Sequence, residues 1–477
     1  MSLFQRVFGR FLPVSARSMA YSAARNPAGR PAWTAPRGGA NEAVGGAALT
    51  VAARARDAVR NNPYIARIVD LWVANAVRAG ITTRWPKNNR TAKVWRTWSE
   101  GLACDATGQN NMAGIQALAM RAMVEGGEAL IRFRQVRPTA ANPVGLELLV
   151  MEGDRLDWSK TGIAAQGNRI LQGIEVNEAG RPVAYWILPE EVPAWSRRLE
   201  PERVPAEDMI HLFRQRRPGQ MRDLSWLAPV LWPARDLTQY EAALLRKAEI
   251  EACTSLVVTD DGEETATGAA VTDAYGNTVE DLQPGMIMYR RGGGSIDVVN
   301  PSGGGSHTAF AKRSLEAQAV GAGLTYDQVS GDLSQANYSS LRAGKIEFWQ
   351  LLDQVQYTIL VPRLCHRVAE RFYEAGLLVG MWAVAMPEVT HIPPAPELVQ
   401  PLDDTKAMIL QERAGYVPPQ EMTGRFGYEW ADNVEKIKQA NADRDGAGLI
   451  QDTDPRKTSA NGAAQASESA EQAPPES

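Results

Sequence analysis

The stretch GDLSQANYSSLRAGKIEFWQ, residues 331–350, opens the most regular pattern in the chain. From Tyr338 onward, apolar side chains recur every three or four residues, which predicts a long helix. Proline removes one helical hydrogen bond and its ring strikes the preceding turn, so we expect a kink at Pro362. The register on both sides of that proline is carried by Leu341, Lys345, Phe348, Leu352, Val355, Ile359, Leu364, Val368 and Phe372.

Two further helices are predicted upstream of this run. Apolar residues spaced by three and four indicate an amphipathic helix over 233–251 and a shorter helix over 308–320. At 1.5 Å per residue the first helix would be about 28 Å long, enough to serve as a strut across a domain. The residues between the two helices, 254–306, are polar and glycine-rich, and we expect them to form a β-containing insertion.

The first half of the chain mixes helical and strand patterns. A helix is predicted to follow the sequence NNP at 61–63 and to end at Gly80, and another is predicted over 112–125. Alternating apolar residues predict strands near 131–133, 146–150, 182–188 and 209–213. The fold class is therefore α+β. A proline-rich hinge, HIPPAPELVQP, then leads into a small helical region that ends near residue 448.

The two ends of the chain differ in charge from its body. Residues 1–60 carry nine Arg, no Lys and two acids, and we expect a flexible basic arm there. Residues 451–477 are polar and net acidic, and we expect a disordered tail. The body between the ends has a net charge of −8, which argues against tight nonspecific binding of duplex DNA by a basic patch.

No pattern of catalytic, cofactor-binding or metal-binding residues is present, so we do not expect an enzyme. A P-loop needs Gly-Lys followed by Ser or Thr, but the Gly344–Lys345 pair precedes Ile346. The four histidines form no paired-ligand motif, and the three cysteines lie far apart. An apolar stretch such as 375–387 has 13 residues, short of the roughly 20 that span a bilayer, and we expect no membrane partner.

Two basic features remain as candidate contacts for phosphate or a protein partner. The first is the arginine-bearing arm, and the second is the cluster Arg214, Arg216, Arg217 and Arg222. A solvated charged loop would have the same composition, and that interpretation stays open. The cluster segment, 214–222, contains no aromatic residue and so lacks the pattern of a single-strand binding surface.

Residues 331–350 resemble the most distinctive stretch of the lambda-type portal proteins of tailed phages. The resemblance covers roughly residues 61–450. Arg78 and Asp223 stand where we expect glycine in relatives. The other segments that carry it are NNPYIARIVDLWVANAVRAGI at 61–81, the Trp95 to Gly108 segment, GGE at 126–128, EGDRLD at 152–157, IHLFRQRRPGQMRDLSWLAPVL at 210–231 and the Pro401 to Gly415 segment.

The resemblance implies a portal fold and a ring, usually of twelve subunits, at one vertex of the capsid. Double-stranded DNA would pass through this ring without sequence-specific contacts during packaging and ejection, and the chain would reside in the virion after assembly in the host cytoplasm. The implied partners are other copies of the chain, the terminase large subunit, the major capsid protein and a head–tail adaptor. The implied divisions are an arm (1–60), a wing (61–232 and 338–390), stem helices (233–252 and 307–322), a clip (253–306), a tunnel loop (323–337), a crown (391–450) and a tail (451–477).

The implied tunnel loop is the expected DNA-contacting segment. It contains two acids and neither Lys nor Arg, so twelve copies would repel a phosphate backbone within a Debye length of about 8 to 10 Å. We hypothesise that this repulsion keeps a sliding duplex from adhering to the wall. The residues assigned to the channel are Asp327, Gln328, Ser330, Asp332, Ser334, Gln335 and Asn337.

Two alternatives to a portal protein remain open at the level of the sequence. The chain could be another head–tail connector or minor capsid protein, which ring size and position in the virion would distinguish. It could also belong to a different class, as the DNA-packaging ATPase or nuclease itself. Nucleotide hydrolysis by the purified protein would favour that class, whereas ring-shaped particles without hydrolysis would favour a portal.

Overall fold

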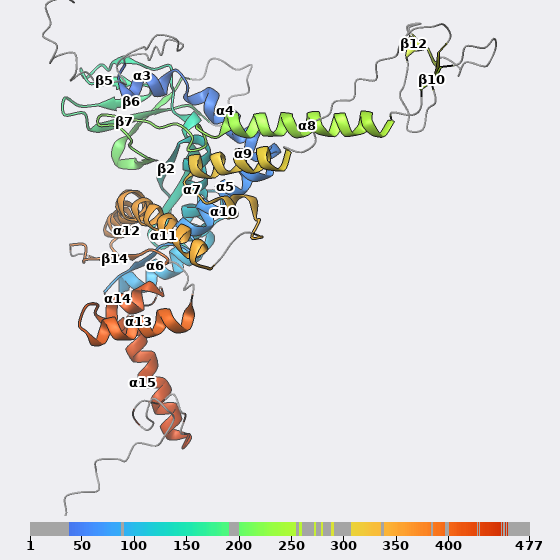
Figure 1. Ribbon diagram of the computed structural model, residues 1–477. Helices are drawn as coiled ribbons and strands as arrows, with labels where there is room; N and C mark the ends of the chain where they lie inside the picture. Colours follow the sequence, from blue (N-terminus) through green and yellow to red (C-terminus); the bar gives the residue numbers. More distant parts are fainter. Residues whose placement is uncertain are drawn as a thin grey trace, which may run out of the picture.

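The computed structural model describes most of the chain. The described residues are 38–86, 90–189, 200–253, 257–259, 271–272, 278–279, 288–290, 307–334, 338–382, 385–395, 400–426, 428, 430–449, 451, 454 and 456. Figure 1 shows a mixed body of helices and strands from which one long helix projects to the right, with a smaller group of helices below the body.

A three-stranded antiparallel sheet lies at the centre of the body. Its order is β3 (Leu146–Glu152), β2 (Glu128–Gln135) and β9 (Met209–Phe213). Ile131 of β2 lies opposite Val150 on one side and Ile210 on the other. Since neighbouring residues of a strand point to opposite faces, Ile131 enters the large core on one face of this sheet, whereas Leu130 enters a second, smaller core.

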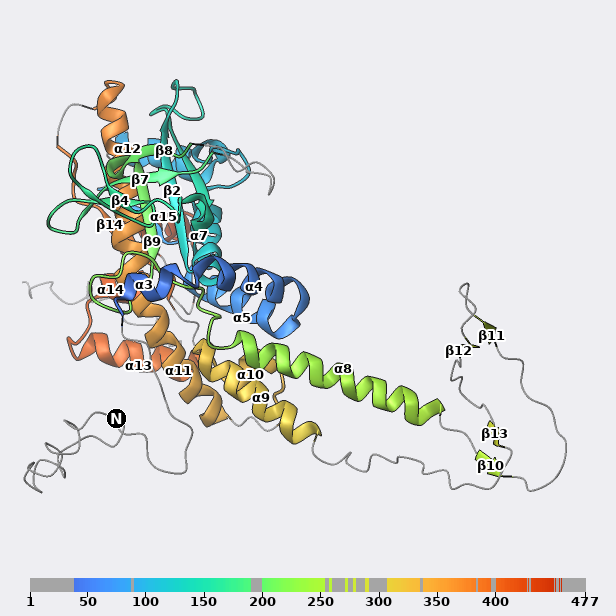
Figure 2. The same ribbon diagram turned by 90° about the horizontal axis from the view of Figure 1, so that it is seen from above.

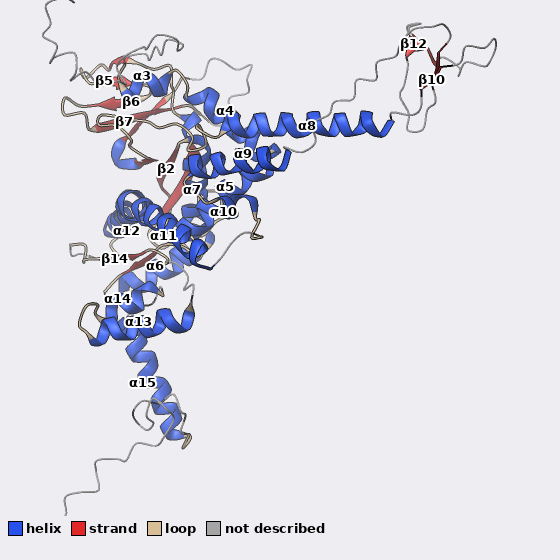
Figure 3. Ribbon diagram, in the orientation of Figure 1, coloured by secondary structure: helices blue, strands red, loops and turns tan. Residues whose placement is uncertain are grey.

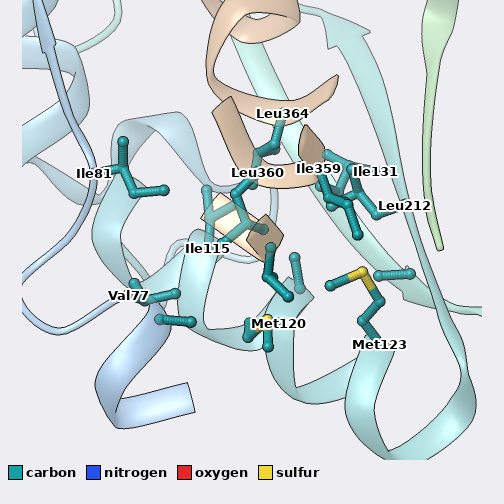
Figure 4. Close-up of a cluster of buried hydrophobic side chains, with 14 of the residues drawn as sticks. Val77, Ile81, Ile115, Met120, Met123, Ile131, Leu212, Ile359, Leu360 and Leu364 are labelled. Atoms are coloured by element: carbon teal, nitrogen blue, oxygen red, sulfur yellow. The ribbon is translucent and has the colours of Figure 1, made fainter. Parts of the chain in front are cut away.

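Helix α7 covers the face of the sheet that borders the large core, and helix α5 packs against α7. Asn62 caps α5 (Pro63–Ala76) by accepting bonds from two backbone N–H groups, and Asn111 caps α7 (Met112–Gly126). Gly127 ends α7 in the left-handed conformation, with φ of +96°, and leads directly into β2. Figure 4 shows Ile115, Met120 and Met123 of α7 among the side chains of this core.

The smaller core lies against a five-stranded antiparallel sheet in sequential order (Figure 3). Short turns join the first four strands, so each of these pairs with its neighbour in the chain. The strands are β4 (Gly162–Ile163), β5 (Arg169–Leu171), β6 (Ile174–Val176), β7 (Pro182–Ile187) and β8 (Glu202–Pro205). Single-turn helices η3 (Gly153–Arg155) and η4 (Ala206–Asp208) connect this sheet to the central one. The prediction of an α+β fold is confirmed.

The long periodic run forms one continuous helical segment that passes through Pro362 without ending there, and the kink expected at Pro362 stays a prediction. Helix α11 (Tyr338–Val355) passes into a ten-residue π-helical segment, η5 (Gln356–Cys365), and then into α12 (His366–Leu378). Proline has no N–H to donate, and the wider π-helical turns accommodate it without ending the helix. The segment η5 places Ile359, Leu360 and Leu364 in the large core (Figure 4).

Aromatic residues close the far end of the large core. Trp95 and Trp98 of α6 (Arg90–Glu100) contact Phe372 of α12 at ring-centroid distances of 4.9 and 5.0 Å. The single-turn helix η2 (Leu102–Cys104) follows α6. Strand β1 (Thr82–Arg84) pairs with β14 (Thr390–Ile392) and so joins the early and late parts of the chain. Arg78, just before β1, has φ of +49°, a conformation that favours glycine.

The prediction of a flexible arm over residues 1–60 is wrong for the last third of that range. Residues there form α3 (Ala40–Gly45) and α4 (Ala48–Asn61), while residues 1–37 lie outside the described residues. The small side chains of Ala48, Ala52 and Ala55 share one face of α4 and are buried, because they allow the helix to pack closely against α5 and α7.

Two antiparallel helices form the projecting part, as Figure 2 shows. They are α8 (Leu231–Cys253) and α9 (His307–Ala322), at the positions predicted from periodicity. The described parts of the insertion between them are four short strands in two pairs, β10 (Val257–Thr259) with β13 (Met288–Arg290), and β11 (Val271–Thr272) with β12 (Thr278–Val279).

The last described elements are three helices, α13 (Pro401–Arg413), α14 (Pro419–Arg425) and α15 (Trp430–Gly446). Neither α13 nor α15 has a buried residue. Of the expected tail, Arg456 is described, and it pairs with Asp445 and Asp454 at 3.2 and 2.7 Å. Across the described ranges, none of the helices combines the length and apolar composition needed to cross a membrane.

Candidate functional site

The candidate site is the hairpin of α8 and α9 together with the segment that follows it. At the base of the hairpin, Ser314 Oγ lies 3.5 Å from the carbonyl oxygen of Pro233. Farther along, the ring of Tyr240 stacks on His307 and contacts Phe310, with centroid distances of 5.7 and 4.6 Å. Beyond Tyr240 the described side chains of α8 are mostly exposed, because this part of the helix extends past the start of α9 (Figure 2).

The segment expected to be a tunnel loop is partly helical. Residues Tyr326–Ser330 form α10, which begins with a capping box between Thr325 and Gln328 and ends at Gly331 with φ of +73°. A Thr-x-x-Gln sequence followed by Gly explains this short helix, because it satisfies the free backbone groups at both ends. The helix α10 packs against α9 and α5.

The side chains assigned to the channel divide into those held by local bonds and those exposed. Gln328 Oε1 accepts bonds from the backbone N–H and the hydroxyl of Thr325, at 3.0 and 3.1 Å. Ser330 Oγ donates to the carbonyl of Tyr326 at 2.8 Å. Asp327 lies in the first turn of α10 and is half-buried, whereas Asp332 and Ser334 are exposed. Gln335 and Asn337 lie outside the described residues.

Asp332 is the best-defined charge of this segment. Its carboxylate accepts bonds from the backbone N–H of Ser334 at 2.9 Å and from the hydroxyl of Tyr326 at 3.3 Å. Hydrogen bonds from Ser334 are the main cause that lowers the pKa of Asp332, and Lys312 contributes through its charge. Asp332 is therefore ionised at neutral pH.

Two cations that sequence proximity did not indicate lie beside this segment. The ammonium of Lys312, on α9, is 5.5 Å from the ring centroid of Tyr326, and the guanidinium of Arg67, on α5, donates to the carbonyl of Gln328. Residues 323–337 themselves contain neither Lys nor Arg, but Lys312 and Arg67 from other helices contact them. The folded surface around α10 carries both signs of charge.

The four-arginine cluster does not form one surface. Arg222 is completely buried and cannot contact phosphate, which corrects its assignment as a candidate contact. Arg214 lies 4.6 Å from the ring centroid of Trp226, and its burial lowers its pKa. Arg216 lies 3.5 Å from Asp223, and Arg217 donates to the carbonyl of Gly38. The exposed charges left for a partner are those of Arg216 and Arg217.

Catalytic chemistry finds no support among the described residues. Burial raises the pKa of the Cys104 and Cys365 thiols to about 12, so both stay protonated and unreactive. Burial, together with the charge of His366, lowers the pKa of His391 to about 4. In the part of the chain that the structure describes, no group of three His, Cys, Asp or Glu residues could hold a metal ion.

An open groove lies between the body and the helices α13 and α14. Its volume is about 1000 Å³, and Trp349, Tyr357 and Phe426 are among the side chains that line it. Large apolar side chains are also exposed nearby, including Leu402, Leu410 and Tyr416, with exposed fractions of 69%, 64% and 81%. This surface is typical of a chain that associates with other copies or partners.

Comparison with known proteins identifies the family. The model of "Phage portal protein, lambda family" matches residues 28–356. The probable portal protein of Halomonas phage phiHAP-1 is 26% identical over 359 residues, which are 70% of this chain and 67% of that protein. The portal protein of Escherichia phage N15 is 22% identical over 345 residues, 62% of this chain and 63% of its own. The chain thus spans about two thirds of the length of these relatives.

Solved structures give a weaker likeness. A chain in the neck of a native GTA particle, computed with C12 symmetry, aligns with a TM-score of 0.44 and 15% identity, over 78% of this chain and 91% of that one. A chain in the virion of a native gene transfer agent particle aligns with a TM-score of 0.43 and 15% identity, over 86% of this chain and 97% of that one. The family match covers more than half of the residues and confirms the resemblance seen in the sequence. The chain belongs to the lambda family of phage portal proteins.

Proposed function

We propose that twelve copies of this chain form a closed ring at one vertex of a phage capsid, around a channel for double-stranded DNA. As a portal protein the chain is a structural component of the virion and not an enzyme. A closed ring needs a heterologous interface, in which one face of each copy binds a different face of the next. ATP hydrolysis for packaging would come from the partner terminase.

The observation that carries this proposal is the exposed hairpin of α8 and α9. Leu245 of α8 and Val320 of α9 are 63% and 78% exposed, and Trp232 at the start of α8 is 60% exposed. Large apolar groups on a two-helix projection gain stability when neighbouring copies cover them. In this proposal α8 and α9 are the stem helices, and 253–306 forms the clip that meets the terminase large subunit and later the head–tail adaptor.

The body would supply the wider parts of the ring. The α+β region, 61–232 with 338–390, corresponds to the wing that contacts the major capsid protein, and α13 to α15 correspond to the crown. Because α13 and α15 bury none of their own residues, the crown gains its packing from adjacent copies.

The ring is tested by mass photometry and negative-stain microscopy of the purified protein. Twelve copies of 52.0 kDa give about 620 kDa and a particle with a central hole. A polypeptide that stays monomeric at every concentration, or that hydrolyses ATP unaided, would contradict the proposal.

The channel assignment needs a separate test in a packaging reaction. We propose that Asp327 and Asp332 face the DNA, and that replacing both by Lys makes the wall attractive to phosphate. Packaging by rings of this variant should slow, and the defect should shrink as salt rises, because counterions screen the attraction. Glu100→Lys, on the exposed end of α6, is the matched control. Packaged lengths equal to wild type at all ionic strengths would remove the assignment.

A further inference from the structure

Three segments that lie far apart in the sequence meet at one buried ion network. Glu128 begins β2, Gly153 follows β3, and Arg222 lies in the connection between β9 and α8. Arg222 Nε donates to both carboxylate oxygens of Glu128 at 3.0 and 3.1 Å, and a terminal nitrogen of Arg222 also contacts that carboxylate. The side chains of Arg222 and Glu128 are 0% and 1% exposed.

Every polar edge of this guanidinium is occupied. One terminal nitrogen donates to the carbonyl of Gln172 at 2.9 Å, and the other donates to the carbonyl of Gly153 at 2.7 Å. The guanidinium lies 3.1 Å from the ring centroid of Trp158. His211 Nε2 is 2.9 Å from the second oxygen of Glu128. Arg222 is thereby tied to the central sheet and to the turn between β5 and β6.

The connection that carries Arg222 leads directly into α8. Residues 214–230 contain neither a helix nor a strand, so side-chain and turn contacts fix their path. Ser225 Oγ and the backbone N–H of Trp226 both bond to the carbonyl of Val124, each at 3.1 Å. The connection also passes so close to Gly127 that a Cβ on that glycine would lie 2.4 Å from the carbonyl carbon of Leu224.

We propose that the Glu128–Arg222 pair is the positioning device that sets the direction in which α8 leaves the body, and so the angle between neighbouring copies in a ring. This inference rests on the ring proposed above. Apolar contacts around the connection are non-directional and tolerate sliding, whereas a two-pronged guanidinium–carboxylate pair fixes both distance and orientation. Rings of twelve and thirteen copies differ by about 2° in the rotation per copy, so a small change in direction changes the ring size.

The test replaces the pair by apolar residues of similar size, Glu128→Leu with Arg222→Met in the full chain. Such a replacement of a buried ion pair can preserve folding. The control is Glu175→Leu with Arg203→Met, since Glu175 is also 0% exposed and bonds to Arg203 at 2.8 Å, but within the five-stranded sheet. Mass photometry should show one ring mass for the wild type and the control, and at least two ring masses, or open fragments, for the Glu128/Arg222 variant.

A single ring mass in the Glu128/Arg222 variant, equal to that of the wild type, would overturn the inference. If that variant does not fold, Arg222→Lys decides, because lysine keeps the charge and lacks the planar fork. Arg222→Lys should broaden the distribution of ring masses, and an unchanged distribution would equally overturn the inference. The ring mass of the wild type is measured first. A wild type that forms no ring would refute the proposed ring itself, not the role of the Glu128–Arg222 pair.

Discussion

Substituting Arg222 alone should reverse the sign of the contribution that Glu128 makes to the pH dependence of the unfolding free energy. In the wild type, burial by itself would raise the pKa of Glu128, but the charge of Arg222 and the bond to His211 outweigh burial and hold that pKa below its ordinary value. In Arg222→Met the buried carboxylate keeps only His211 as a partner. Burial then dominates, and the pKa of Glu128 rises above its ordinary value.

The size of the stability loss in Arg222→Met follows from the complete burial of Glu128 and Arg222. Removing one partner of a fully buried ion pair costs about 3–5 kcal/mol at neutral pH. The cost falls in acid, because one unit of pKa shift corresponds to about 1.4 kcal/mol and a protonated Glu128 no longer presents a buried charge. Protonation of His211 would act in the same direction, since it returns a cation to the carboxylate.

The sign of the pH dependence therefore differs between the two proteins. In the wild type the lowered pKa of Glu128 contributes stability above about pH 4.3, and this contribution is lost as the pH falls through the folded-state pKa. In Arg222→Met the raised pKa contributes stability below about pH 4.3, and this contribution is lost as the pH rises. The difference in unfolding free energy between the two proteins should widen from about pH 4.5 to 7.

Urea unfolding followed by tryptophan fluorescence between pH 4.5 and 7.5 measures this difference. Arg132→Met is the control, because Arg132 pairs with Glu202 at 2.6 Å but Glu202 is 58% exposed, and an exposed pair contributes at most about 1 kcal/mol. A loss below about 1 kcal/mol at pH 7 in Arg222→Met, or a difference from wild type that narrows as the pH rises, would refute the reasoning.

Three further changes test other parts of the structure. In urea unfolding, Gly127→Ala should lower the free energy of unfolding more than Gly180→Ala does. Both glycines have positive φ, which costs an alanine about 1–2 kcal/mol, but of the two only Gly127 would bring the added Cβ against backbone, at 2.4 Å. Equal losses of unfolding free energy would contradict this. Asp105→Ala should cost about 2–3 kcal/mol in the same assay, because the Asp105 carboxylate accepts five hydrogen bonds, and a loss under 0.5 kcal/mol would show them to be dispensable. Leu410→Asp should change stability by less than about 0.5 kcal/mol, since Leu410 is 64% exposed, but should lower the fraction of rings seen by mass photometry; an unchanged ring fraction would exclude this side chain from the interface.

The elements with strong local periodicity were predictable from the sequence. The helices α8, α9 and α12 and the strands β3, β7 and β9 lie where apolar spacing predicted them, because burial of one face imposes that spacing. Helix α4 was missed because its buried face consists of alanines, which also occur in flexible segments. The π-helical path through Pro362 was missed because proline more often bends or ends a helix.

The charges near the candidate site could not be placed from sequence alone. Arg222 belongs to a run of arginines typical of an exposed loop, and its partner Glu128 lies 94 positions earlier in the chain. No local signal connects two such residues, although GGE and the segment around Arg222 both carried the family resemblance. The same applies to Lys312 and Arg67, which reach the α10 segment through tertiary packing.

The projecting hairpin makes small movements at its base large at its end. Helix α8 has 23 residues and is about 34 Å long, so a rotation of about 5° at Leu231 moves Cys253 by about 3 Å. The point of this rotation lies at the end of the connection that carries Arg222. If the Glu128–Arg222 pair sets the direction of α8, as proposed above, loss of that pair would displace the far end of the hairpin as well.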